Sequence, residues 1–177
     1  MQALLVIDVQ EALMKLGDFQ ADVWKIESVI KHFKATGKPV IFIKHVEDDK
    51  ESLFYKKSRD VEVYAPLLPY ADDIIEKRTP SAFFETDLDD VLRILDVDHV
   101  VVTGFNAEYC CLFTAISAFD RGYKVTFLED AIGTVNNADS YEMPGLNICG
   151  FAGSVLHWSR TTEVVNYGEY VGKYALK

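Results

Sequence analysis

The chain has few cysteines and no excess of positive charge, and both shortages restrict what the protein can be. Only three cysteines occur among 177 residues, whereas a secreted disulfide scaffold carries an even and denser set. We therefore expect free thiols and a cytoplasmic location. Acidic residues outnumber basic residues by 28 to 18, which gives a formal charge of −10. Because nucleic-acid binding requires a basic surface, nucleic acid is not an expected partner.

Long apolar runs and nucleotide-binding sequences are also lacking. No apolar run approaches the roughly 20 residues that a membrane-spanning helix needs, so no membrane partner is expected. The first ten residues, MQALLVIDVQ, contain no basic segment, and Asp8 interrupts their apolar run. This pattern favours a buried strand over a signal peptide. Neither a G-x-G-x-x-G sequence after this strand nor a P-loop occurs, and we therefore expect no cofactor.

Two kinds of apolar segment alternate along the chain. Short runs rich in Val, Ile and Leu predict strands, and longer segments with apolar residues three or four apart predict helices. This alternation indicates βαβ units and a parallel sheet covered by helices on both faces. We expect one domain over residues 1–177, a three-layer α/β/α fold with a six-stranded, mostly parallel, Rossmann-like sheet. The predicted strands are 3–8, 39–44, 72–77, 98–104, 124–129 and 162–166, and the predicted helices are 22–35, 88–95, 107–121 and 149–158.

Two charged residues stand at predicted strand ends, where doubly wound sheets gather their functional groups. Asp8 ends the first predicted strand and Lys77 ends the third. Each has an ordinary alternative role, because Asp8 can cap a helix and Lys77 can be solvated. Pairing the two charges would offset the cost of burying both.

Adjacent cysteines, Cys110 and Cys111, lie where a predicted strand turns into a helix. The positive end of a helix dipole lowers the pKa of a cysteine near it, and backbone amides there can hold an oxyanion. Free cysteines are also common as small buried residues. Neighbours on a helix point about 100° apart, so the two thiols face different surroundings. The spacing does not decide which thiol reacts.

Three longer blocks, LLVIDVQ, EKRTPSAFFETDL and VVVTGFNAEYCCLFTAISAFDRGYKVTFLEDA, resemble the isochorismatase-like cysteine hydrolases. The resemblance covers roughly residues 3–131. It implies a catalytic triad of Asp8, Lys77 and Cys110, which leaves Cys111 a packing role. The implied activity is that of a metal-independent amidohydrolase on a small-molecule substrate, with a thioester on Cys110. Asp8 would act as general base and acid, with Lys77 as its electrostatic partner.

The resemblance also implies a special backbone after the fourth strand. A cis peptide bond is expected between Phe105 and Asn106. Its implied use is to aim backbone amides, including those near Ala107 and Cys110, at the substrate oxygen. Relatives of this kind commonly assemble, so a homo-oligomer, either a dimer or a tetramer, is expected.

One departure from the relatives concerns metal binding. Nicotinamidases carry an Asp-x-His and a further histidine that bind a metal, whereas the segment IKHVEDDKE offers only His45. Since metal ligation normally needs three or four protein ligands, we expect no metal and doubt nicotinamide as the substrate. His45 itself either lines the pocket or caps the strand end.

Further pocket residues are expected from aromatic and loop positions. Phe83 and Phe84 suit the wall of a site for a small planar ligand, although core packing is an equal alternative for one of them. Pro144 and Gly145 would break a helix, so residues 141–146, beginning at Tyr141, are expected to form a loop. That loop either helps to select the substrate at the pocket mouth or only turns the chain.

Three other functions stay open at this point. A thiol hydrolase could act on an ester instead of an amide. An isochorismatase-type vinyl-ether hydrolase is less favoured, because isochorismatases proper lack the cysteine. A non-catalytic or redox-sensing relative would use Cys110 as an easily oxidised thiol.

Overall fold

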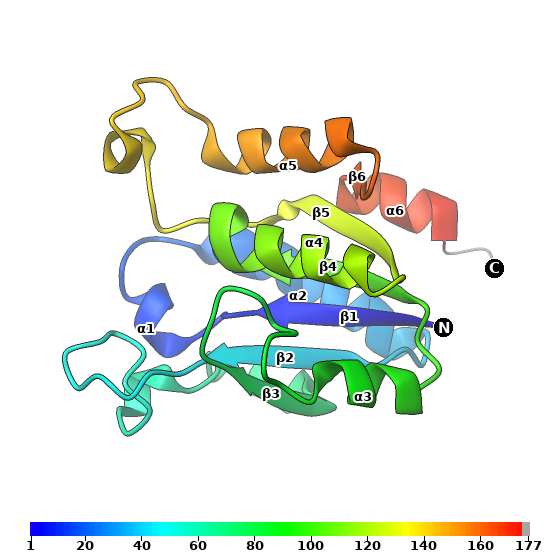
Figure 1. Cartoon of the computed structure of the whole chain (residues 1–177), viewed down its shortest axis with the longest axis horizontal. Coiled ribbons are helices and arrows are strands. Elements are labelled where there is room, and N and C mark those ends of the chain that lie inside the picture. Colours follow the sequence, from blue (N-terminus) through cyan, green and yellow to red (C-terminus); the bar gives the residue numbers. More distant parts are fainter. Residues whose placement is uncertain (175–177) are drawn as a thin grey trace.

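Six parallel strands form one central sheet in the computed structural model of the chain, in the order β3-β2-β1-β4-β5-β6 (Figure 1). The structure describes residues 1–174. The predicted six-stranded Rossmann-like fold is confirmed, and the sheet is wholly parallel rather than mostly so. The strands are β1 (Gln2–Ile7), β2 (Val40–His45), β3 (Asp73–Lys77), β4 (His99–Gly104), β5 (Lys124–Ile132) and β6 (Glu163–Val165).

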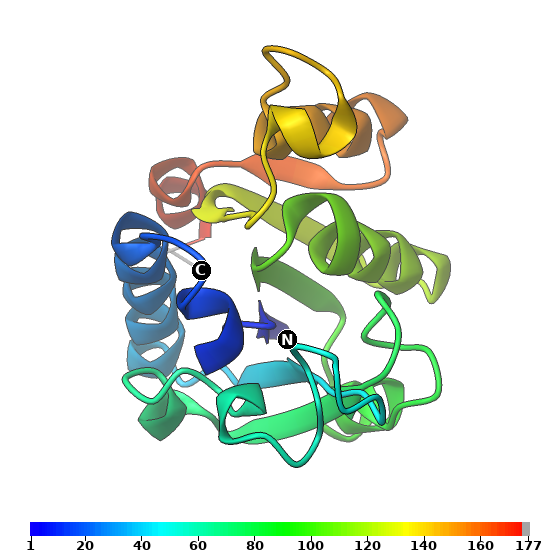
Figure 2. The ribbon, with the colours of Figure 1, turned by 90° about the vertical axis from the view of Figure 1, so that its left-hand side faces the viewer.

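Helices cover both faces of this sheet and make the three layers. Apolar residues of α3, α4 and α5 pack on one face, and those of α1, α2 and α6 pack on the other. Figure 2 shows α2 and α4 on opposite sides of the strands. The helices are α1 (Glu11–Met14), α2 (Gln20–Ala35), α3 (Leu88–Ile94), α4 (Leu112–Asp120), α5 (Ile148–Ser159) and α6 (Tyr167–Tyr174), with short turns η1 (Arg59–Val61), η2 (Leu68–Tyr70), η3 (Ala107–Cys111) and η4 (Ala138–Tyr141).

The sequence of β1 shows why the sheet is buried on both faces. Successive side chains of a strand point to opposite faces. In β1, Leu5 and Ile7 join the core under α3, α4 and α5, whereas Leu4 and Val6 join the core under α2. All four are fully buried. An uninterrupted apolar run is therefore what this central strand requires.

The differences from the predicted elements have local causes. The predicted helix 107–121 is not uniform, since it begins with the wide π-helical turn η3 before α4. The four residues of α1 are too few to show a helical period. In α6 the side chains that face the core, Tyr167, Tyr170, Val171 and Tyr174, are mostly tyrosines, which an apolar pattern does not pick out. Among residues 1–174, no helix combines the length and the apolar character that crossing a membrane requires.

Candidate active site

The strand order reverses between β1 and β4, and a glycine brings the ends of these two strands together. Gly104 ends β4 with φ 114°, and a Cβ built on it would lie only 2.0 Å from the backbone oxygen of Ile7. A side chain does not fit there. Asp8 follows Ile7 with φ 50°, a left-handed conformation that non-glycine residues hold only where the surroundings enforce it. The segment after β4 thereby starts beside Asp8.

Lys77 contacts each of the other candidate residues at the carboxyl ends of the strands, and we call these residues the Lys77 group. Its side chain is buried, and its Nζ lies 2.7 Å from Oδ2 of Asp8 and 3.2 Å from Sγ of Cys110. Nδ1 of His45 lies 3.0 Å from the same nitrogen. An ammonium has three N–H groups, and three possible acceptors, a carboxylate oxygen, a thiol sulfur and an imidazole nitrogen, lie within 3.2 Å of this one. The structure brings the three expected triad residues together and adds His45 to them.

Sheet register accounts for the positions of His45 and Lys77. The two residues are paired across β2 and β3, so their side chains share a face. Gln10 fixes the end of β2 through both ends of its amide. It donates to the carbonyl oxygen of His45 and accepts from the amide of His45, both at 3.0 Å. Gln10 has no role in the prediction from sequence, although it lies only two residues after Asp8.

Burial and charge set the protonation states in this group. Burial, assisted by the negative charge of Asp8, raises the pKa of the Cys110 thiol to about 12, and Lys77 only partly opposes this. The expectation of a lowered pKa at a helix N-terminus is therefore wrong for the free protein. Burial also disfavours the ammonium of Lys77, but Asp8 and Cys110 outweigh it and raise the pKa of Lys77. The resting group is a neutral thiol beside an Asp8–Lys77 ion pair.

The two adjacent cysteines have different surroundings. Cys110 is partly exposed and bonded to Lys77, whereas Cys111 is fully buried among apolar residues. Burial also raises the pKa of Cys111. Cys111 therefore packs in the core, as the resemblance implies, and its thiol is closed to solvent.

The segment between β4 and α4 is held mainly through its backbone. The peptide bond between Phe105 and Asn106 is cis. The backbone oxygen of Asn106 accepts from the amides of Tyr109 and Cys111. The amide of Ala107 donates to the carbonyl oxygen of Gly133 at 2.9 Å. That amide is therefore used within the protein and is not free to donate to a substrate oxygen.

The expected aromatic walls are not equivalent. Phe83 is 4% exposed and stacks against Tyr123 in the core, with 5.9 Å between the ring centroids. The core-packing alternative therefore applies to Phe83. Phe84 is 53% exposed and lies at the surface.

Tyr141 connects its loop to the turn that carries Cys110. Its hydroxyl donates to Oε1 of Glu108 at 2.9 Å. The same oxygen accepts from the side chains of Thr134 and Asn136. Glu108 lies in η3 only two residues before Cys110. The loop, for which a place at the pocket mouth was one of two alternatives, is thus hydrogen-bonded to the segment that carries Cys110.

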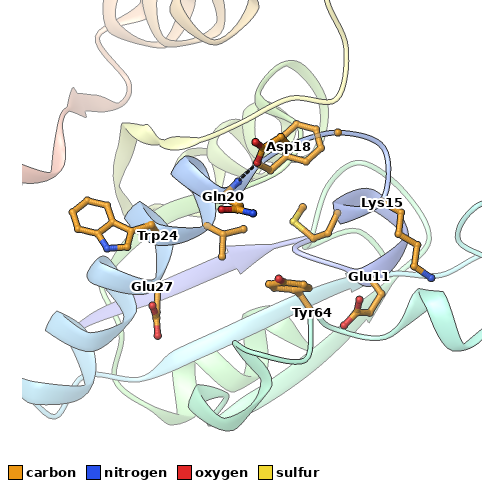
Figure 3. Close-up of a pocket in the computed structure, with 11 residues that line it drawn as sticks. Glu11, Lys15, Asp18, Gln20, Trp24, Glu27 and Tyr64 are labelled. Atoms are coloured by element: carbon orange, nitrogen blue, oxygen red, sulfur yellow. Dashed lines mark hydrogen bonds between the residues drawn. The ribbon is translucent and has the colours of Figure 1, made fainter.

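A cavity of about 560 Å³ lies between α1, the start of α2 and Tyr64 (Figure 3). Its polar lining includes Glu11, Lys15 and Asp18. Asp8, Lys77 and Cys110 are not among the residues that line it. This cavity is therefore separate from the Lys77 group, and its lining offers no thiol.

A doubly wound sheet that gathers an aspartate, a lysine and a cysteine at its reversal point is the arrangement that a hydrolase with a cysteine nucleophile would require. The chain belongs to the isochorismatase family, whose Isochorismatase domain matches residues 2–144. It is accordingly an enzyme, a hydrolase. Among residues 1–174, no three or more His, Cys, Asp or Glu side chains are grouped to hold a metal ion.

Known proteins place the chain among hydrolases of this family. The uncharacterised isochorismatase family protein YddQ of Bacillus subtilis (strain 168) is 32% identical over 139 residues, which are 75% of this chain and 77% of YddQ. Nicotinamidase 3 of Arabidopsis thaliana is 39% identical over 82 residues, 46% of this chain and 41% of that protein. A crystal structure from Burkholderia xenovorans LB400, assigned provisionally as an isochorismatase, is 30% identical with a TM-score of 0.85 and covers 97% of this chain and 86% of that one.

Proposed function

We propose that the protein hydrolyses a C–N bond of a small amide through a thioester on Cys110. The observation that carries this proposal is the contact of one buried ammonium, that of Lys77, with both Asp8 Oδ2 at 2.7 Å and Cys110 Sγ at 3.2 Å. A base, a thiol and a fixed positive charge are the parts that acyl transfer requires. The similarity to a nicotinamidase supports an amide over an ester or a vinyl ether.

The reaction begins with a proton transfer, because the resting thiol is neutral. Asp8 takes the thiol proton as the sulfur of Cys110 attacks the carbonyl carbon and the carbonyl electron pair moves onto oxygen. Collapse of this intermediate breaks the C–N bond, and Asp8 returns the proton to the leaving nitrogen. Water, with Asp8 as its base, then attacks the thioester and releases the acid and the thiol. Oδ1 of Asp8 is buried and has no hydrogen-bond partner among the described residues, which suits it to carry this proton.

Lys77 stays charged throughout this cycle. Its raised pKa keeps the ammonium protonated at neutral pH. Its positive charge stabilises the Asp8 carboxylate before the transfer and the Cys110 thiolate after it. Because the amides of Ala107, Tyr109 and Cys111 already donate to backbone oxygens, we assign the oxyanion to the backbone amide of Cys110 itself.

The test is a panel of small amides, esters and one vinyl ether, followed by intact-mass measurement with the slowest amide substrate. We expect amide turnover and an acyl adduct on the native protein and on Cys111→Ala. Cys110→Ala should show neither amide turnover nor an acyl adduct. Turnover of only esters or the vinyl ether, or full amide turnover by Cys110→Ala, would contradict the proposal. No step requires a metal or a cofactor.

A further inference from the structure

We propose that His45, itself held by Glu47, is a positioning residue that fixes the ammonium of Lys77 during the reaction. The proposal rests on the proposed cysteine chemistry but concerns a residue outside the triad. Two of the three acceptors around Nζ of Lys77, Asp8 and Cys110, exchange a proton in the cycle. The third acceptor, Nδ1 of His45 at 3.0 Å, takes no part in that exchange. It is the one contact that holds the ammonium in the same place at every step.

The contacts of His45 define its tautomer. A lysine ammonium can only donate hydrogen bonds, so Nδ1 must be the unprotonated ring nitrogen. The proton is then on Nε2, which lies 3.0 Å from Oε1 of Glu47. Hydrogen bonds from Ser52 and His45 lower the pKa of Glu47, so its carboxylate is present to accept this proton. Lys77 therefore donates to His45, which donates in turn to Glu47. The contacts of Lys77 with Asp8 and Cys110 run outward from the same nitrogen.

The imidazole ring is also fixed mechanically. The ring of Phe54 packs edge-on against it, with 4.8 Å between the centroids. The amide of Glu47 donates to Phe54, and the carbonyl oxygen of Glu47 accepts from Lys56. His45 is 8% exposed. The loop after β2 therefore holds both the ring and the carboxylate that orients it.

The charges around His45 keep it neutral. Lys77 from β3 and Asp8 from the end of β1 face the ring on one side, and Glu47 from the following loop faces it on the other. Burial, followed by the positive charge of Lys77, lowers the pKa of His45, although Asp8 and Glu47 oppose this. Protonation of Nδ1 would turn the acceptor into a donor that faces an ammonium. The bond to Lys77 would then be lost at low pH.

The kinetic test compares His45→Leu and His45→Asn with His99→Leu. His99 is a matched control, because it is also a buried histidine with two polar partners, Gln2 and Thr126. Misplacement of a catalytic group by about 1 Å costs about 10²-fold in rate, and we expect a kcat loss of this order for His45→Leu with little change in KM. Asn offers an amide oxygen close to the position of Nδ1, so His45→Asn should recover activity to within about tenfold. In the native protein, protonation of His45 should lower kcat at low pH. This fall should be absent from His45→Asn.

A second measurement does not depend on turnover. Ring ¹⁵N spectra of the native protein should show His45 unprotonated at Nδ1 and protonated at Nε2, with the signal assigned by its loss in His45→Asn. The slowly exchanging ¹⁵Nζ signal of Lys77 should persist in His99→Leu and disappear in His45→Leu.

The outcomes separate this proposal from the proposed function. A native protein that cleaves no amide, yet shows this tautomer and a Lys77 signal that depends on His45, would reject the function and retain the positioning role. An Nδ1-protonated ring would overturn the positioning role even in an active enzyme. Equal kcat losses in His45→Leu and His99→Leu, without recovery in His45→Asn, would overturn it as well.

Discussion

Lys77 and Asp8 pair across an intervening strand: Nζ and Oδ2 lie 2.7 Å apart although β2 separates β3 from β1. Both side chains are almost fully buried. Removal of one partner from a buried pair leaves an uncompensated charge, whereas replacement of both by apolar residues is often tolerated.

Because the two charges are paired, replacing both should restore the stability that replacing one removes, without restoring activity. Lys77→Met should lower the free energy of unfolding by about 3–5 kcal/mol, because Asp8 is left unpaired. The double variant Asp8→Leu with Lys77→Met should recover most of that loss and still be inactive. Urea unfolding and amide turnover, measured on the same samples, check both expectations. Activity in the double variant would show that the pair is only structural.

A second prediction concerns the contact that joins β4 to β1. Gly104→Ala adds a Cβ 2.0 Å from the Ile7 oxygen in a left-handed conformation, and strain together with overpacking should cost about 2–6 kcal/mol. Gly122→Ala is the matched control, because Gly122 has φ 90° but nothing within 4 Å of the added Cβ. Gly122→Ala should therefore lose only about 1–3 kcal/mol of stability, the cost of the strained backbone conformation. Equal urea-unfolding losses in the two variants would contradict the close approach.

The pH dependence of thiol alkylation follows from the raised pKa of Cys110. With a pKa of about 12, only about one thiol in 10⁵ is ionised at pH 7 in the free protein. The rate of Cys110 labelling by iodoacetamide should therefore rise about tenfold per pH unit from pH 7 to 10 without a plateau. Peptide mass spectrometry identifies the labelled residue, and buried Cys111 should label far more slowly. A plateau near neutral pH would instead show a thiolate in the resting enzyme.

The residues around Lys77 also show which parts of the site can be predicted from the sequence. The positions of Asp8 and Lys77 at strand ends could be predicted, because the apolar run before each residue shows where its strand ends. Contact of Lys77 with His45 depends on the register of β2 against β3, which no local pattern encodes. The pKa of Cys110 depends on how deeply the folded chain buries it, whereas the helix dipole alone predicts a lowered pKa. The choice of Cys110 over Cys111 came from the resemblance rather than from helical spacing.

A further prediction concerns the loop at Tyr141. Tyr141→Phe removes one hydrogen bond to the carboxylate of the partly buried Glu108, which should cost about 1.5–3 kcal/mol. Tyr70→Phe is the control, since Tyr70 also donates to a glutamate, Glu27, from a different part of the fold. If the loop shapes the pocket, KM for the best amide should rise in Tyr141→Phe only. Unchanged KM in both variants would leave the loop a purely connecting role and reject its part in substrate selection.

The expected homo-oligomer has a candidate surface on α4 and α5. Phe113 and Phe119 of α4 are 48% and 44% exposed, and Phe151 and Trp158 of α5 are 60% and 81% exposed. Large apolar side chains gathered on one side of a soluble protein are typical of an interface. Light scattering after size exclusion should show a dimer or tetramer for the native chain and a monomer for Phe151→Asp with Trp158→Asp. Trp24→Asp, at a 65% exposed tryptophan of α2 on the other side of the sheet, should leave the assembly unchanged. A native chain that stays monomeric at micromolar concentration would show that this surface has no role in self-association.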